Sequence, residues 1–241
     1  MEDTIDRKEA YRKVNLTTLI PEATLAPNRS IPDNVHSIDL GEIGVIAEEM
    51  LDRSLADRHA RERGRPILLD PRTKDVMVNQ EDTVGSSEQV KYTISYQCDA
   101  AGNAVKRDSR TRPFFVGTIH THSIHDLPVS PKDVEFLLLD PEHPTSKTVV
   151  ILVTHQRKTV IFRGRNSPRW NWERAEANIK LWFEDIDKKA RKRLRSNMSH
   201  EEQLGINAIV NQEFVRFLKN KYDLRIFSTS VENNVVTRET S

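Results

Sequence analysis

The chain carries its most informative stretch at Phe114-Phe115-Val116-Gly117-Thr118-Ile119-His120-Thr121-His122, which is followed after seven further residues by Ser130-Pro131-Lys132-Asp133. The bulky apolar run of residues 114–119 predicts a central β-strand. Side chains at positions i and i+2 of a strand project to the same face, so His120 and His122 can both reach one metal ion. The stretch therefore predicts a strand that ends in a metal site.

The second half of this motif predicts the start of a helix. Ser130 suits the N-cap, Pro131 suits the first helical position, and Asp133 suits the third. A helix that begins beside a metal points its backbone N–H groups and the positive end of its dipole into the site. We therefore expect Asp133 to be a first-turn acid and the third metal ligand, and Ser130 to stabilise an oxyanion.

The ligand set favours zinc as the cofactor. Catalytic zinc commonly keeps three protein ligands of nitrogen and oxygen type and leaves the fourth position to water. Two neutral imidazoles and one carboxylate leave a residual positive charge, which lowers the pKa of bound water. The alternative is a pair of ordinary, partly buried histidines on a strand. His125 and Asp126, in the loop between the two halves of the motif, are competing ligands.

Composition excludes several classes of protein. The 241 residues have a formal net charge of +1, so no global field attracts nucleic acid or an anionic membrane. Cys98 is the single cysteine, which excludes an internal disulfide and a Cys-rich zinc module and fits a reducing compartment. Neither a bilayer-spanning apolar run nor a secretion signal is visible, so we expect a cytoplasmic location.

Hydrophobic patterning predicts an α/β fold in three parts. Residues 1–35 are polar and contain three prolines, which favours an extended N-terminal arm. Residues 36–166 are expected to form one domain that carries the metal motif, with a helix from Ile43 to about Arg61 that Gly64 and Pro66 end. Residues 167–241 carry two amphipathic helices and are expected to form a C-terminal helical extension. Strands are expected at residues 67–69, 76–78, 90–96, 114–119, 148–154 and 159–163.

The spacing His120-x-His122-x(7)-Ser130-x-x-Asp133 resembles the signature of JAMM (MPN-type) zinc metalloproteases. All four signature positions match in residue type and spacing. The position after the second histidine, often proline in that family, is Ser123 here. The resemblance extends loosely over residues 38–164 and implies a JAMM/MPN-like, cytidine-deaminase-like fold, which is a mixed β-sheet flanked by helices.

The resemblance also implies an upstream glutamate that acts through the metal-bound water. Glu62 is the candidate, because it stands where the first helix of the domain gives way to a strand. Glu48 and Glu49 lie in the middle of that helix, away from the junction. The alternative is that Glu62 is one more acid in the charged stretch of residues 58–63.

The resemblance implies a zinc-dependent metallopeptidase that hydrolyses an amide or isopeptide bond after the C-terminal tail of a ubiquitin-like protein. That protein or its conjugate would be both substrate and partner. One alternative is a non-catalytic MPN-like scaffold that binds a protein through the C-terminal helices. Another is a DNA-associated protein, because residues 188–195 form a dense basic run. A solvated helix face is the simpler explanation of that run, so we expect neither a membrane nor a nucleic acid as partner.

Overall fold

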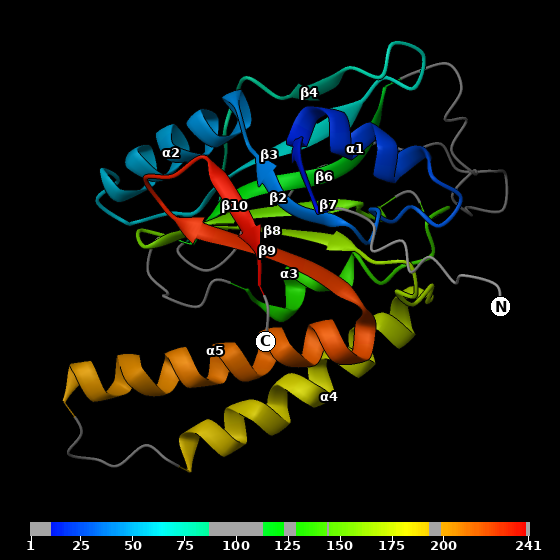
Figure 1. The fold of residues 1–241 in the computed structure, drawn as a ribbon. Helices are drawn as coiled ribbons and strands as arrows, with labels where there is room; N and C mark the ends of the chain where they lie inside the picture. The colour runs from blue at the N-terminus through cyan, green and yellow to red at the C-terminus, as the bar shows by residue number, and fades with distance from the viewer. Residues whose placement is uncertain (1–10, 87–112, 123–128, 144, 193–198, 240–241) are drawn as a thin grey trace, which may run out of the picture.

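The computed structural model describes residues 11–86, 113–122, 129–143, 145–192 and 199–239, which form one mixed sheet with helices on both faces (Figure 1). The strands are β1 Arg12–Asn15, β2 Val35–Asp39, β3 Arg63–Leu69, β4 Val76–Val78, β5 Thr83–Val84, β6 Phe114–Thr121, β7 Val149–Val153, β8 Arg157–Arg163, β9 Leu224–Ser230 and β10 Val235–Arg238. The helices are α1 Leu16–Leu25, α2 Glu42–Leu55, α3 Pro131–Glu135, α4 Trp172–Arg191 and α5 His200–Tyr222.

The sheet has the strand order β1-β2-β10-β9-β8-β7-β6-β3-β4, and β5 also pairs with β3. The pairs β1–β2 and β6–β7 are parallel, and the other pairs are antiparallel. The predicted α/β class is confirmed as a curled mixed sheet flanked by helices, and the strands predicted at residues 76–78, 114–119, 148–154 and 159–163 are confirmed. The strand predicted at residues 90–96 lies outside the described residues.

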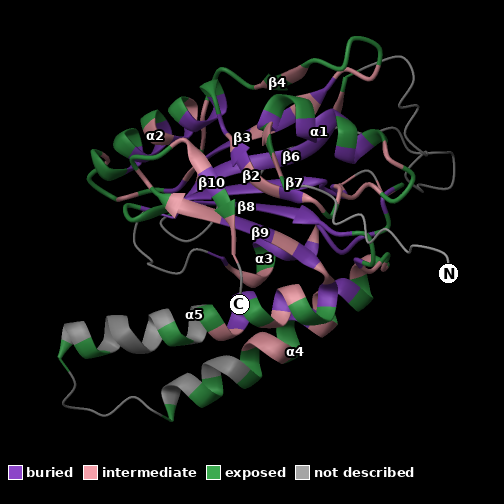
Figure 2. Cartoon of the chain, in the orientation of Figure 1, coloured by how far each residue is buried: buried purple, intermediate pink, exposed green. Residues whose placement is uncertain are grey.

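Two apolar clusters cover the two faces of the sheet (Figure 2). On one face α1 and α2 pack against Val149 and Ile151, and on the other face α3, α4 and α5 pack against Val150 and Leu152. Successive residues of a strand point to opposite faces, so β7 contributes to both clusters and every one of its residues is buried. Among the described residues, none of the helices is both long and apolar enough to cross a membrane.

The N-terminal segment does not form an extended arm. Its described part supplies the edge strand β1 and the helix α1, in which Leu16, Leu19 and Ile20 are fully buried. Together with Ala23, these residues follow the helical spacing i, i+3, i+4 and i+7 and form an apolar stripe. The average composition of the segment is polar and gives no sign of this stripe. Pro21 lies inside the helix, so the three prolines of residues 1–35 were a misleading sign of extended structure.

The C-terminal segment is not a separate helical extension. The two predicted helices are confirmed as α4 and α5, but β9 and β10 then return to the middle of the sheet, where β9 lies between β8 and β10. The helical pair is therefore an insertion between two neighbouring strands, and Figure 1 shows it along one side of the sheet. The strand β9 ends in the polar residues Ser228-Thr229-Ser230 and β10 has only four residues, so the two return strands gave only a weak hydrophobic pattern.

The helix α2 is shorter than predicted. It ends at Leu55 instead of about Arg61, and Gly64 and Pro66 lie within β3, not at the end of a helix. The hydroxyl of Ser54 donates to the carbonyl oxygen of Arg61 at 2.6 Å, which folds the intervening residues back onto the last turn of the helix. A tertiary hydrogen bond of this kind leaves no trace in hydrophobic periodicity.

Candidate metal centre

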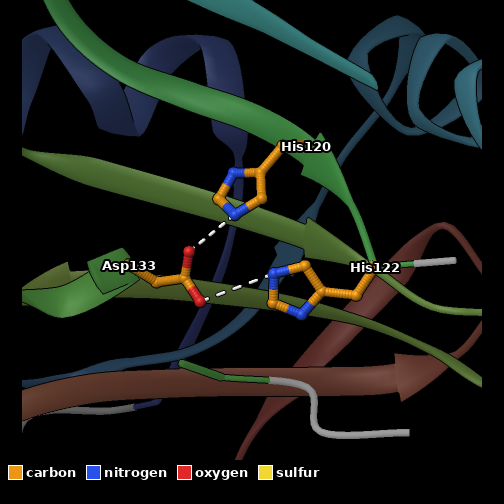
Figure 3. A group of neighbouring side chains, drawn as sticks. All are labelled: His120, His122 and Asp133. Atoms are coloured by element: carbon orange, nitrogen blue, oxygen red, sulfur yellow. Dashed lines mark hydrogen bonds and ion pairs between the residues drawn. The ribbon is translucent and has the colours of Figure 1, made fainter. Parts of the chain in front are cut away.

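Three buried side chains converge at the end of β6 (Figure 3). His120 lies on β6 and His122 follows its last residue, while Asp133 comes from the first turn of α3. The Nε2 atom of His120 lies 2.6 Å from Asp133 Oδ1, and the Nε2 atom of His122 lies 3.6 Å from Asp133 Oδ2. All possible ligand atoms of the group lie within 4.8 Å of one another, so these residues can hold a metal ion, as predicted.

The local backbone explains why these side chains meet. His122 N–H donates to the carbonyl oxygen of Val153 at 2.9 Å, which continues the parallel ladder of β6 and β7 past the end of β6. Both histidines therefore keep the strand alternation and share one face of the sheet. Ser130 is the N-cap of α3, as predicted, and its N–H donates to Asp133 Oδ2 at 2.6 Å. This bond fixes the Asp133 carboxylate, the third ligand, in front of the two rings.

The electrostatics of the site favour the protonation states that a metal requires. Burial lowers the pKa of His120 and outweighs the opposing effect of Asp133, so the ring is neutral at pH 7. Burial alone would raise the pKa of Asp133, but the two imidazoles and the bonds from His120 and Ser130 hold that pKa well below its usual range. A neutral imidazole and an ionised carboxylate are metal ligands without further proton release.

Two observations show that the group fits a small metal ion such as zinc. Ligands about 2.0 Å from zinc in tetrahedral geometry lie roughly 3.3 Å apart. The separation of His122 from Asp133 is already close to that value, and His120 has to move away from Asp133 by less than 1 Å. In addition, the buried Nδ1 of His120 has no hydrogen-bond partner among the described residues. The atom is thus available to carry the ring proton when Nε2 serves as a ligand.

Glu62 is buried and lies next to the metal centre in the sheet. It immediately precedes β3, whose antiparallel register with β6 pairs Gly64 with His120. The same register continued by two residues places Glu62 opposite His122, on the face that carries the ligands. Its backbone is held on the other side, because Glu62 N–H donates to Ser86 O at 2.8 Å and Glu62 O accepts from Gly85 N–H at 2.9 Å.

Of the other two glutamate candidates, one forms an ion pair with a buried lysine and the other is exposed. Glu48 forms an ion pair with the buried ammonium of Lys158, and Glu49 is exposed on α2, 4.0 Å from Arg53. Glu62 does not end a helix as predicted, since α2 stops seven residues earlier, but it does directly precede a strand. The competing ligands His125 and Asp126 lie outside the described residues.

Sequence reasoning missed Lys147, a buried cation beside the metal centre. Its Nζ donates to Thr118 Oγ1 at 3.1 Å and lies 4.5 Å from the centre of the Phe136 ring. Thr118 precedes His120 by two residues and so shares its face of β6. Burial lowers the pKa of Lys147 to about 8, against the opposing charges of Asp133 and Glu135. The only signal in the sequence was a lysine two residues before the apolar run of β7.

Replacing Lys147 by Met should stabilise the metal-free protein at pH 7. The pKa of Lys147 is about 8 when folded and 10.5 ordinarily, so the unfolded chain binds more protons between these values and stability rises with pH there. The shift corresponds to an unfavourable contribution of about 3 kcal/mol below pH 8. Urea unfolding should therefore show a gain for Lys147→Met at pH 7 that shrinks towards pH 10.5.

The exposed Lys180 provides a matched control for this prediction. Lys180→Met removes the same charge from the surface of α4, and its effect on the free energy of unfolding should be small at both pH values. An equal effect of Lys147→Met on the free energy of unfolding at pH 7 and pH 10.5 would show that the buried ammonium of Lys147 does not destabilise the folded state.

Comparisons with known proteins identify no relative of this chain. No family model matches it, and neither a curated protein nor a solved structure matches it. The residues of the metal centre and the fold that brings them together are therefore the features that indicate a function.

Proposed function

We propose that this protein is a zinc-dependent metallopeptidase of the JAMM (MPN) type that hydrolyses an amide or isopeptide bond. The observation that carries the proposal is the convergence of His120, His122 and Asp133 in one buried group at the spacing of the JAMM signature. The position of the buried Glu62 opposite His122 supports it. The mixed sheet, which has helices on both faces, agrees with the architecture that the resemblance implies.

The residues of the centre divide into holding and reacting groups. His120, His122 and Asp133 would hold the metal, which when bound supplies a Lewis acid that polarises the scissile carbonyl and acidifies water. The Glu62 carboxylate accepts a proton from the attacking water and delivers it to the leaving amine. The Ser130 hydroxyl, partly exposed beside Asp133, donates to the oxyanion that develops on the substrate. Burial of the ligands keeps bulk water away from them and strengthens each of these interactions.

The substrate that we propose is the extended C-terminal tail of a ubiquitin-like protein, either as a fusion or as an isopeptide conjugate. An extended tail can pair with a sheet edge, and β4 and β5 form such an edge beside β3, the strand that Glu62 precedes. The single cysteine agrees with a reducing, cytoplasmic setting for this activity.

The proposal is tested by measuring metal content and hydrolysis together. Purified protein reconstituted with zinc should hold about one ion per chain and cleave at least one member of a panel of ubiquitin-like proteins fused to a fluorescent amine. A chelator should stop cleavage, and added zinc should restore it. Failure to bind zinc after reconstitution, or cleavage that persists with chelator, would contradict the proposal.

A scaffold role is the second candidate, because the helical insertion exposes large apolar side chains. Leu181 on α4 is 68% exposed and Ile209 on α5 is 45% exposed. Exposed apolar residues on a projecting helical pair are suited to a protein partner. A partner that raises the melting temperature equally for the wild type and for His120→Ala would favour this role. The basic run of residues 188–195 lies partly outside the described residues and supports no DNA-binding proposal.

A further inference from the structure

A polar cavity lies at the opposite end of β6 from the metal centre. Its volume is about 450 Å³, and its walls come from the end of α1, the start of β6, the segment after α3 and the segment before α4. Phe114, the first residue of β6, lines it, and six steps of extended strand, roughly 20 Å, separate Phe114 from His120. Cavities of this volume are large enough for small-molecule ligands. The cavity is therefore a separate site.

Arg29 brings an unpartnered guanidinium to the cavity. Its side chain is half-buried, and within the described part of the chain no hydrogen bond or ion pair ends on it. The backbone of Arg29 has a φ of 46°, a left-handed conformation that residues with a side chain rarely adopt. A half-buried cation that is held in an unfavourable conformation and lacks a partner indicates a place for an anionic group.

Arg169 supplies a second guanidinium whose direction is fixed. Its Nη2 donates to Asn28 Oδ1 at 2.7 Å and to Pro27 O at 3.3 Å, and its other nitrogens have no partner among the described residues. The charge of Arg169 contributes to lowering the pKa of Arg29, after the larger effect of burial, so the two guanidinium groups repel each other. An anion between them would relieve this repulsion and could accept hydrogen bonds from both.

Asp140 and Glu142 line the same cavity and balance the two arginines. Both carboxylates act on Arg29 through their charge. The Oδ1 atom of Asp140 accepts a bond from Glu142 N–H at 2.8 Å, which holds the two acids on one turn. A purely anionic ligand would meet this acidic turn, whereas a molecule with one positive and one negative end complements the two arginines at one end and Asp140 at the other.

We propose that this cavity binds a free α-amino acid or a dipeptide. The ligand carboxylate lies between Arg29 and Arg169, and its ammonium group faces Asp140 at the start of the acidic turn. The volume of the cavity leaves room for a side chain or a second residue. Neither the metal ligands nor Glu62 takes part in this binding. A negative result for this site would therefore not contradict the proposed hydrolase activity, and loss of the hydrolase activity would not contradict this site.

Calorimetry and thermal unfolding of the full chain test the proposal. The probes are the standard L-amino acids and diglycine, with acetate, methylammonium and inorganic phosphate as single-charge or purely anionic comparisons. At least one amino acid or diglycine should bind with a Kd below about 10 mM and raise the melting temperature by a few degrees at saturation. Acetate and methylammonium should each bind at least about tenfold more weakly, because each engages only half of the charged groups.

Variants link the binding to the named side chains. Arg29→Gln and Asp140→Asn should each weaken amino-acid binding by at least about tenfold. Asp140→Asn keeps the Oδ1 acceptor for Glu142 N–H, so its fold is preserved even if Arg29→Gln does not fold. Arg165→Gln, an exposed arginine outside the cavity lining, should change nothing, and His122→Ala should bind the amino acid normally.

Three results would overturn the proposal. The first is an absence of amino-acid and diglycine binding at about 10 mM. The second is binding of inorganic phosphate or acetate as tight as that of the best amino acid, which would make this a simple anion site. The third is unchanged amino-acid affinity in the folded Arg29→Gln and Asp140→Asn proteins.

Discussion

His122→Ala should abolish metal binding while leaving the fold intact. Loss of a residue that merely supports a metal ligand typically weakens binding by about 10- to 100-fold, so removal of one of three direct ligands should exceed that range. The variant leaves His120 and Asp133 paired at 2.6 Å, and the backbone bond from His122 N–H to Val153 O does not need the imidazole. Zinc titration monitored by calorimetry, together with metal analysis after dialysis, measures the change.

His36→Ala is the matched control for this prediction. His36 is a partly buried histidine on β2 of the same sheet, outside the metal-binding group. Its removal should leave the zinc stoichiometry and affinity unchanged. Zinc should also raise the melting temperature of the wild type and of His36→Ala, but not that of His122→Ala, because a ligand that binds the folded state stabilises that state. Equal zinc affinity in all three proteins would place the metal elsewhere.

Glu62→Gln should separate metal binding from turnover. The amide keeps the size and hydrogen-bonding capacity of the side chain but cannot accept the proton of water, and loss of a general base typically lowers turnover by about 10²- to 10⁴-fold. Zinc content should stay at the wild-type level, because Glu62 is not one of the three grouped ligands. Steady-state cleavage of the fusion substrate and metal analysis of the same preparation give both quantities.

Glu49→Gln controls for the loss of one acidic charge on this side of the molecule. Glu49 is exposed on α2, and its nearest cation, Arg53, lies 4.0 Å away, so the change should leave turnover within about twofold of the wild type. Full activity in Glu62→Gln would assign the base to another residue. Loss of zinc in Glu62→Gln would instead make Glu62 a ligand, and the division between holding and reacting groups would be wrong.

The metal centre was predictable from sequence because its geometry is local. His120 and His122 meet through the two-residue repeat of one strand, and Asp133 follows from the capping pattern at the start of α3. A stretch of fourteen residues, from His120 to Asp133, contains all three ligands. Lys147 escaped prediction because its place beside Thr118 depends on the parallel pairing of β7 with β6, which no short pattern encodes.

The outer parts of the fold were mispredicted because they depend on distant partners. The strand β9 depends on its neighbours β8 and β10, and its register with β8 pairs Val160 with Phe227. Likewise α1 is held by an apolar stripe that packs on a sheet built from later residues. Average polarity and proline content describe a segment by itself, so they cannot report a contact with residues far away in the chain.

The position of the helical insertion bears on how the sheet assembles. Arg163 and Leu224 are partners in the β8–β9 ladder although sixty residues separate them, and closing a flexible loop of that length opposes pairing by about 4 kcal/mol. Helices α4 and α5 reduce the barrier, because each forms through local contacts and the stacking of Trp182 on Phe217 then brings the two ends of the loop together. In kinetic terms, helices that form before the sheet would replace a slow, long-range strand pairing by the closure of shorter loops.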